Sequence, residues 1–151
     1  MLTQAQACQK AAAYCAEQEK CIFDIKIKLV QWNIDKALHA KIIDTLVEEN
    51  FINEQRYAES FARGKLKNNH WGKIKIAAEL KTKHIPQQYI QHALDSIDKQ
   101  VYENILKMLL QKKLKMGAGK SVEVKNKAAQ YAISKGFESA LVFSVLKIEI
   151  E

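Results

Sequence analysis

Apolar residues recur with the period of an α-helix along almost the whole chain, and the pattern breaks at short intervals. The stripe formed by Leu38, Ile42 and Leu46 after Asp35 is one example. A single proline and five glycines leave almost no turn residues for β-hairpins, while residues that favour helices are abundant. The sequence therefore predicts an all-α fold.

Residues that favour helix starts stand at the breaks and divide the chain into nine expected helices of 10 to 17 residues. Thr3 and Asn53 are good N-caps, and Pro86 suits a first turn, where its missing N–H would be unpaired anyway. Cys21 with Asp24 forms an imperfect capping box. The other expected starts lie at Asp35, Gly72, Lys99, Ser121 and Glu138.

An internal repeat groups these helices in threes. Five residues recur 51 positions later: Leu29, Ile34, Ile43, Asp44 and Leu46 correspond to Leu80, Ile85, Leu94, Asp95 and Ile97. A looser third copy contains Ala132, Phe137, Leu141, Val145 and Leu146. We therefore expect three tandem three-helix units, 1–50, 51–98 and 99–151. Because each unit is small, neighbouring units should pack edge to edge in an elongated, curved array of the kind that binds macromolecules.

The positive charge is concentrated in one part of the chain. The net charge is +7, and residues 99–135 hold nine Lys or Arg against two Asp or Glu. Like charges this close favour an anionic partner, either phosphate or an acidic protein surface. The predicted binding cluster surrounds the sequence MGAG and contains Lys112, Lys113, Lys115, Lys120, Lys125 and Lys127. A second, weaker basic patch contains Arg56, Arg63, Lys65 and Lys67. For any one lysine, a solvated helix face is the simpler interpretation.

The search for catalytic or metal-binding residues finds no supported site. The four histidines lack metal-ligand spacing, and Cys8, Cys15 and Cys21 match neither a metal pair nor a disulfide framework. GAGK at 117–120 lacks the spacing and the preceding strand of a phosphate loop. No secretory signal or membrane span is expected. We therefore expect a cytoplasmic monomer that is not an enzyme and uses no metal or cofactor.

The stretch HWGKIKIAAELKTKHIP, residues 70–86, has three possible interpretations: a phosphate-binding loop, a helix that reads nucleic acid, or a joint between packed helices. The polar positions of the helix expected in this stretch are lysine, glutamate and threonine, so the helix lacks a compact base-reading face. We interpret Gly72 as a tight helix start, Trp71 as packing against the unit, and Ile76 and Leu80 as core residues.

Residues 51–85 resemble the central signature of the RecX family of RecA regulators. Ile52, Arg56, Tyr57 and Ala58 match its first part, and Gly72, Ile76, Glu79, Leu80, Lys83 and Ile85 match its second. CIFDIKIKL (21–29) and SKGF (134–137) resemble the first and third repeats. Two positions depart from the family: Glu54 replaces an aspartate, and His84 replaces a glycine that ends a helix in the left-handed conformation.

This resemblance implies three tandem three-helix repeats that bind the RecA filament, including the single-stranded DNA within it. The implied function is inhibition of the ATPase, recombination and coprotease activities of RecA in DNA repair and the SOS response. The main alternative is a stand-alone basic helical protein that binds DNA without RecA.

Overall fold

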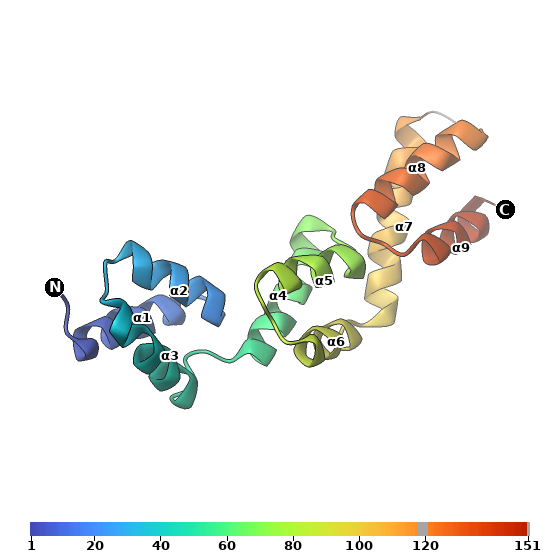
Figure 1. Cartoon of the computed structure of the whole chain (residues 1–151). Helices are drawn as coiled ribbons and strands as arrows, with labels where there is room; N and C mark the ends of the chain where they lie inside the picture. Colours follow the sequence, from blue (N-terminus) through green and yellow to red (C-terminus); the bar gives the residue numbers. More distant parts are fainter. Residues whose placement is uncertain (118–120, 151) are drawn as a thin grey trace.

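The computed structural model describes residues 1–117 and 121–150, with side chains up to Lys147. This part of the chain contains nine α-helices, one short 3-10 helix and no strand, which confirms the all-α fold (Figure 1). The elements are α1 (Gln4–Glu17), α2 (Ile22–Gln31), η1 (Lys36–Leu38), α3 (His39–Glu48), α4 (Glu54–Asn69), α5 (Lys73–Thr82), α6 (Gln87–Asp95), α7 (Lys99–Met116), α8 (Val122–Ser134) and α9 (Ser139–Ile150).

Local capping explains where several helices begin. Thr3 and Gln6 form a capping box, in which the Thr3 N–H donates to Gln6 Oε1 at 3.0 Å and the Gln6 N–H donates to Thr3 Oγ1 at 3.2 Å. Asn53 Oδ1 accepts from the Arg56 N–H at 2.9 Å at the start of α4. These contacts lie within one turn, which is why the sequence predicts them.

The sequence predicts that Asp35 caps the third helix, and Asp35 is the N-cap of a 3-10 turn that leads directly into α3. Asp35 Oδ1 accepts from the Ala37 N–H at 3.1 Å, and the Leu38 N–H donates to the Asp35 carbonyl at 2.9 Å. These shorter-range bonds build a 3-10 turn, and the α-helix begins only at His39.

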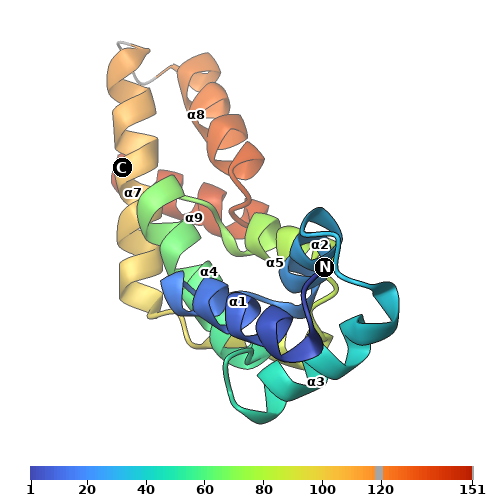
Figure 2. The same ribbon diagram turned by 90° about the vertical axis from the view of Figure 1, so that its left-hand side faces the viewer.

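The helices form three groups, α1–α3, α4–α6 and α7–α9, which follow one another in a bent row (Figure 1). Viewed from the first group, the pair α7 and α8 extends away from the other helices (Figure 2). The elongated, curved array is therefore confirmed. The boundaries after residues 50 and 98 stay a prediction.

The turn between the second and third helix of each group repeats the same backbone geometry. Asn33, His84 and Gly136 have left-handed φ angles of 55°, 59° and 101°. The next residue is buried in each case, and its N–H donates to the carbonyl five residues earlier. These bonds are Ile34 to Leu29 at 3.0 Å, Ile85 to Leu80 at 3.2 Å, and Phe137 to Ala132 at 3.2 Å. The sequence repeat thus corresponds to a repeated structural turn.

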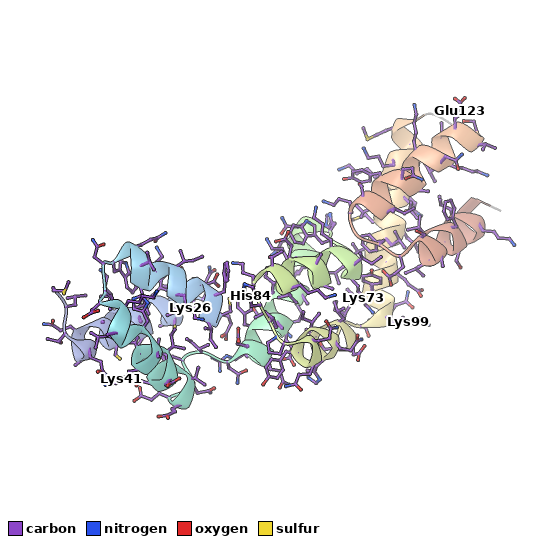
Figure 3. All side chains as sticks on the ribbon, in the orientation of Figure 1. Lys26, Lys41, Lys73, His84, Lys99 and Glu123 are labelled. Carbon is purple, nitrogen blue, oxygen red and sulfur yellow. The ribbon has the colours of Figure 1, made fainter. Side chains whose placement is uncertain are left out.

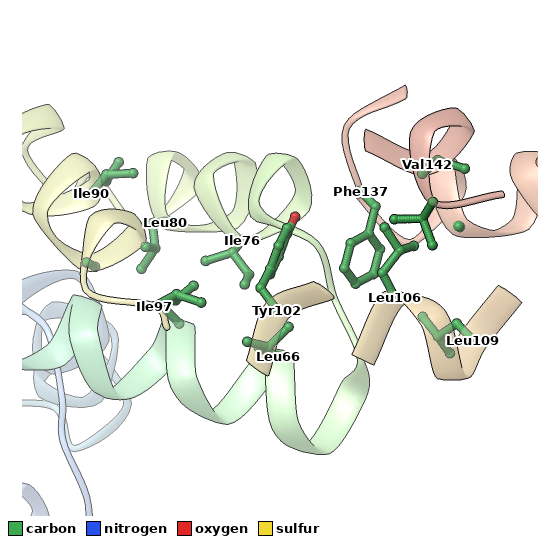
Figure 4. Packing of buried hydrophobic residues seen from close by; sticks show 14 of the residues in the cluster. Leu66, Ile76, Leu80, Ile90, Ile97, Tyr102, Leu106, Leu109, Phe137 and Val142 are labelled. Atoms are coloured by element: carbon green, nitrogen blue, oxygen red, sulfur yellow. The ribbon is translucent and has the colours of Figure 1, made fainter. Parts of the chain in front are cut away.

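The buried side chains form two clusters rather than three. One cluster lies among α1, α2 and α3 and includes Ile52, whereas the other continues through α4–α9 and also includes Cys21 at the start of α2. In the second cluster, Tyr102 of α7 lies between Ile76 on one side and Phe137 on the other, with Leu106 on the far side of the Phe137 ring (Figure 4). The second and third groups therefore share one core, and the first group has its own.

Two glycines permit the close contact between the second and third groups. The Gly72 N–H donates to the Lys135 carbonyl at 2.8 Å, and the Ile74 N–H donates to the Gly136 carbonyl at 3.0 Å. A Cβ on Gly72 would lie 2.3 Å from the carbonyl carbon of Gly136. Gly72 is also the N-cap of α5, which confirms its interpretation as a helix start.

Side chains, rather than paired backbones, join the first and second groups. Arg56 Nε lies 2.5 Å from Glu19 Oε2, and Lys83 Nζ lies 2.7 Å from Asp24 Oδ1. His84 lies at this boundary (Figure 3), and the centre of its ring is 5.5 Å from that of Phe23 in α2, with the two rings tilted by 50°. The first junction is therefore more polar than the second.

Candidate functional site

The predicted basic cluster lies at the tip of the antiparallel pair α7 and α8. Lys112, Lys113 and Lys115 belong to the end of α7, while Lys125 and Lys127 belong to the beginning of α8. The two helices contact each other, and Figure 3 marks Glu123 near the free end of the pair. The structure therefore brings five of the six predicted lysines to one end of the molecule. Lys120 lies outside the described residues.

None of these five lysines forms an ion pair with a carboxylate in the described part of the chain. Lys112, Lys115 and Lys127 are exposed, whereas the Nζ of Lys113 lies 4.1 Å from the centre of the Tyr131 ring. The cluster is thus a positive surface with little internal neutralisation, as an anion-binding surface requires.

Helix dipoles account for only part of this cluster. Lys113 and Lys115 lie in the last turn of α7, where the partial negative charge of the helix end favours cations. Lys125 lies near the beginning of α8, where the partial charge is positive and a cation is disfavoured. The helix dipole therefore does not explain why a lysine occupies position 125, whereas the binding of an anion would explain it.

The second predicted patch is divided between two sides of α4, because Arg56, Arg63 and Lys67 are spaced by seven and four residues and share one helix face, whereas Lys65 lies on the other. Arg56 is held by its ion pair with Glu19 and by a 3.0 Å hydrogen bond from its Nη2 to the Asn50 carbonyl. Its guanidinium therefore joins the first two groups of helices, a contact that the sequence did not reveal because its partner lies 37 residues away.

The other three residues of the patch lie in different surroundings. Lys65 is half-buried, with its Nζ 4.9 Å from the centre of the Trp71 ring. The Nζ of Lys75 lies 4.7 Å from the same ring, which also contacts Phe61. Arg63 and Lys67 are exposed and line a mostly apolar cavity of about 440 Å³ beside the start of α7. The packing of Trp71 against the second core confirms its predicted role.

Sequence reasoning missed Lys20, which follows α1 and precedes the N-cap of α2. Its side chain is only 5% exposed and lines a cavity between the first and second groups. In the sequence it looks like an ordinary surface lysine in a connection, and neither charge nor periodicity marks it. Its burial depends on residues of α1 and α4 that only the tertiary structure brings together.

The three cysteines are poor candidates for chemistry that needs a thiolate. Burial, with a smaller contribution from the charge of Glu49, raises the pKa of Cys8. Burial likewise raises the pKa of Cys15, and that of Cys21 to about 11. Neutral thiols are weak nucleophiles and weak metal ligands. The described residues contain no group of three or more metal-ligating side chains, and no described helix is both long and apolar enough to cross a membrane.

Comparison with known proteins identifies a single family. The sequence model described as RecX, second three-helix domain, matches residues 53–94. The regulatory protein RecX of Clostridium botulinum (strain Eklund 17B / Type B) is 31% identical over 144 residues, which cover 93% of this chain and 67% of that protein. The regulatory protein RecX of Mycobacterium sp. (strain JLS) is 24% identical over 151 residues, covering 94% and 82% of the two chains.

Solved structures show the same fold. The crystal structure of RecX from Lactobacillus salivarius superposes with a TM-score of 0.86 at 22% sequence identity, covering 97% of this chain and 96% of that one. A second crystal structure of regulatory protein RecX gives a TM-score of 0.85 at 24% identity and covers 96% of this chain.

Proposed function

The chain belongs to the RecX family of regulatory proteins, and from this we propose that it binds the RecA recombinase and its filament on single-stranded DNA. Binding restrains the ATPase, recombination and coprotease activities of RecA during DNA repair and the SOS response. The protein is a regulator rather than an enzyme. We propose that it works in the cytoplasm as a monomer, without a cofactor.

Similarity over nearly the whole chain is the observation that carries this proposal, because it covers the helices of all three groups and not only the central motif. The bent row of helices supports it, since an extended protein can follow the groove of a helical filament over several subunits.

The basic tip of α7 and α8 supplies the proposed contact with phosphate. Its five described lysines lack carboxylate partners within the described residues, so phosphates can approach them without first breaking an ion pair. Contacts of this kind release counterions from the nucleic acid, and they weaken steeply as salt rises. The proposed role of the tip is therefore attachment and steering.

The decisive experiment measures RecA ATPase on single-stranded DNA with and without this protein. We expect the wild type to lower the rate at stoichiometric amounts. Replacing the exposed tip residues Lys112, Lys115 and Lys127 by glutamine should raise the concentration needed by about tenfold, because several phosphate contacts are lost together. No change in ATPase with the wild type would refute the proposal.

A matched control removes the same charge from the opposite end of the molecule. Lys26, Lys36 and Lys41 are exposed lysines of the first group, and Figure 3 shows two of them far from the tip. Their replacement by glutamine should leave the concentration dependence within about twofold of the wild type. Equal effects of the two triple variants would show that net charge, rather than the tip, determines binding.

The alternative is a stand-alone basic protein that binds DNA without RecA, and the unpaired lysines of the tip are the observation that favours it. Such a protein would bind duplex DNA with a sequence preference in the absence of RecA. A gel-shift or anisotropy measurement with duplexes of different sequence separates the two functions, since the RecA regulator needs no such preference.

A further inference from the structure

A cavity of about 380 Å³ lies between the first and second groups of helices, and its charges are unbalanced. The end of α1, the start of α2, and α4 and α5 contribute its lining. Its volume is within the range of pockets that hold small ligands. Five charged side chains line it: Glu19, Lys20, Asp24, Lys65 and Lys83.

Two of the lysines have no carboxylate partner. Glu19 is paired with Arg56, and Asp24 is paired with Lys83, so these two acids are already neutralised. Within the described residues no ion pair reaches Lys20 or Lys65. The cavity therefore has two positive charges that its own carboxylates leave uncompensated.

Lys20 is the more unusual of the two because it is almost fully buried. Its side chain is 5% exposed, its Nζ lies 4.3 Å from the centre of the Tyr14 ring, and no hydrogen bond from it is formed within the described residues. Since no buried side-chain nitrogen of the described residues lacks a hydrogen-bond partner, the unbonded Nζ of Lys20 is accessible, and its residue lines the cavity. The Tyr14 ring attracts this ammonium, and an anion would attract it more strongly.

The available donors favour phosphate over carboxylate. Arginine, whose planar fork suits a carboxylate, is present nearby only as Arg56, which Glu19 already occupies. The free groups are two lysine ammoniums, which bind phosphate as point charges. Tyr14 and Phe61 also line the cavity, and their rings lie 4.3 Å and 5.5 Å from the Nζ atoms of Lys20 and Lys65.

We propose that this cavity binds a backbone phosphate of single-stranded nucleic acid, with Lys20 as its central contact and Lys65 as the second. This inference deepens the proposed function, on which it depends for the choice of a nucleic acid as the source of the phosphate. It adds a nucleic-acid contact at the junction between the first and second groups of helices, far from the tip of α7 and α8. A single strand would then be held at two separated points of the array.

The test measures the binding of a labelled short oligothymidylate to the full chain by fluorescence anisotropy, at constant low ionic strength and without RecA. We expect Lys20→Met and Lys65→Met each to weaken binding about tenfold, because each removes one charged contact while keeping a long unbranched side chain. The matched control is Lys28→Met. Lys28 Nζ lies 5.1 Å from the same Tyr14 ring, but Lys28 does not line the cavity. Its replacement should change affinity by less than about twofold.

Competition identifies the chemical group that the cavity recognises. Inorganic phosphate should displace the oligothymidylate from the wild type at millimolar concentrations, and oligoglutamate of equal charge should not. If oligoglutamate displaces the oligothymidylate from the wild type but not from Lys20→Met, the cavity recognises an acidic protein segment and the proposal is wrong. If Lys20→Met weakens the binding of inorganic phosphate but not that of the oligothymidylate, the ligand of the cavity is free phosphate, and the proposed nucleic-acid contact is overturned.

Thermal unfolding separates binding from a structural role. A lysine retained for a ligand should be replaceable by methionine with little loss of melting temperature in phosphate-free buffer, because Lys20 forms no ion pair that the change would break and methionine keeps a long apolar side chain in its place. A large loss of melting temperature in Lys20→Met, with unchanged binding by Lys65→Met, would overturn the proposal. The binding assay contains no RecA. A negative result would therefore overturn the proposed cavity contact without deciding the outcome of the RecA ATPase assay, which tests the proposed function separately.

Discussion

Replacing Gly72 by alanine should force apart the second and third groups of helices. The new Cβ would lie 2.3 Å from the carbonyl carbon of Gly136 and 2.3 Å from the amide nitrogen of Phe137. Both neighbours are backbone atoms, so no side-chain rotation can relieve the overlap. The junction therefore has to open by more than a side-chain adjustment.

The expected cost follows from what this opening breaks. The Gly72 N–H loses the Lys135 carbonyl at 2.8 Å, and the Ile74 N–H loses the Gly136 carbonyl at 3.0 Å. Each bond contributes about 1 kcal/mol net, and a buried N–H left unpaired costs about 1–3 kcal/mol. We expect the free energy of unfolding to fall by about 2–4 kcal/mol, a large share of the stability of an ordinary domain.

Urea unfolding followed by circular dichroism measures this change. For a slope of about 2 kcal/mol/M, the midpoint of the transition should fall by about 1–2 M. Gly64→Ala is the matched control, since Gly64 lies inside α4 and a Cβ there would meet no atom within 4 Å. Alanine is a better helix former than glycine by about 0.5–1 kcal/mol, so this control should raise the midpoint.

The two alanine variants are therefore expected to shift stability in opposite directions. If Gly72→Ala unfolds at the same urea concentration as the wild type, or above it, the close backbone contact does not hold the two groups together. Gly136→Ala offers a second check, because its φ of 101° strains any side chain and its Cβ would lie 2.4 Å from Lys75 Cβ.

Two further predictions concern the side chains at the junctions. Tyr102→Phe should lower the free energy of unfolding by about 1–2 kcal/mol in the same urea assay. The hydroxyl accepts from the Lys73 N–H at 2.9 Å and donates to Glu138, and an unchanged midpoint would contradict its role. At the first junction, burial acts to raise the pKa of Asp24, but hydrogen bonds from Lys83 and Cys21 outweigh it and hold that pKa below its ordinary value. The carboxylate therefore stabilises the fold above its unfolded pKa of about 4 and loses this effect as pH falls through the folded pKa. Asp24→Asn should flatten the loss of melting temperature below about pH 4, and an unaltered acid profile would refute this account.

The helices, most of their starts and the repeat could be predicted because they depend on neighbours in the sequence. Thr3 caps a helix through Gln6, and the left-handed turn at His84 follows from its place in the repeat. The cap at Asp35 is also local, but its side chain supports either a 3-10 turn or an α-helix, and pattern alone does not predict the 3-10 turn that precedes α3.

The basic surfaces were predicted less completely. The tip lysines lie close together because α7 and α8 are consecutive helices joined by a short connection, so proximity in the sequence becomes proximity in space. The patch on α4 separates because Arg56 meets Glu19 and Lys65 meets Trp71, contacts that depend on how the groups of helices pack. Lys20 carries no signal in the sequence, because its burial depends on the same packing.

Periodicity, capping and spacing were sufficient to identify an all-α chain of repeated three-helix groups, because helix formation depends on interactions within a few residues. The division into two hydrophobic cores, the backbone contact at Gly72 and the buried charge of Lys20 arise from residues tens of positions apart. Such contacts depend on the relative orientation of the groups, which side-chain packing sets in three dimensions and helical periodicity does not encode.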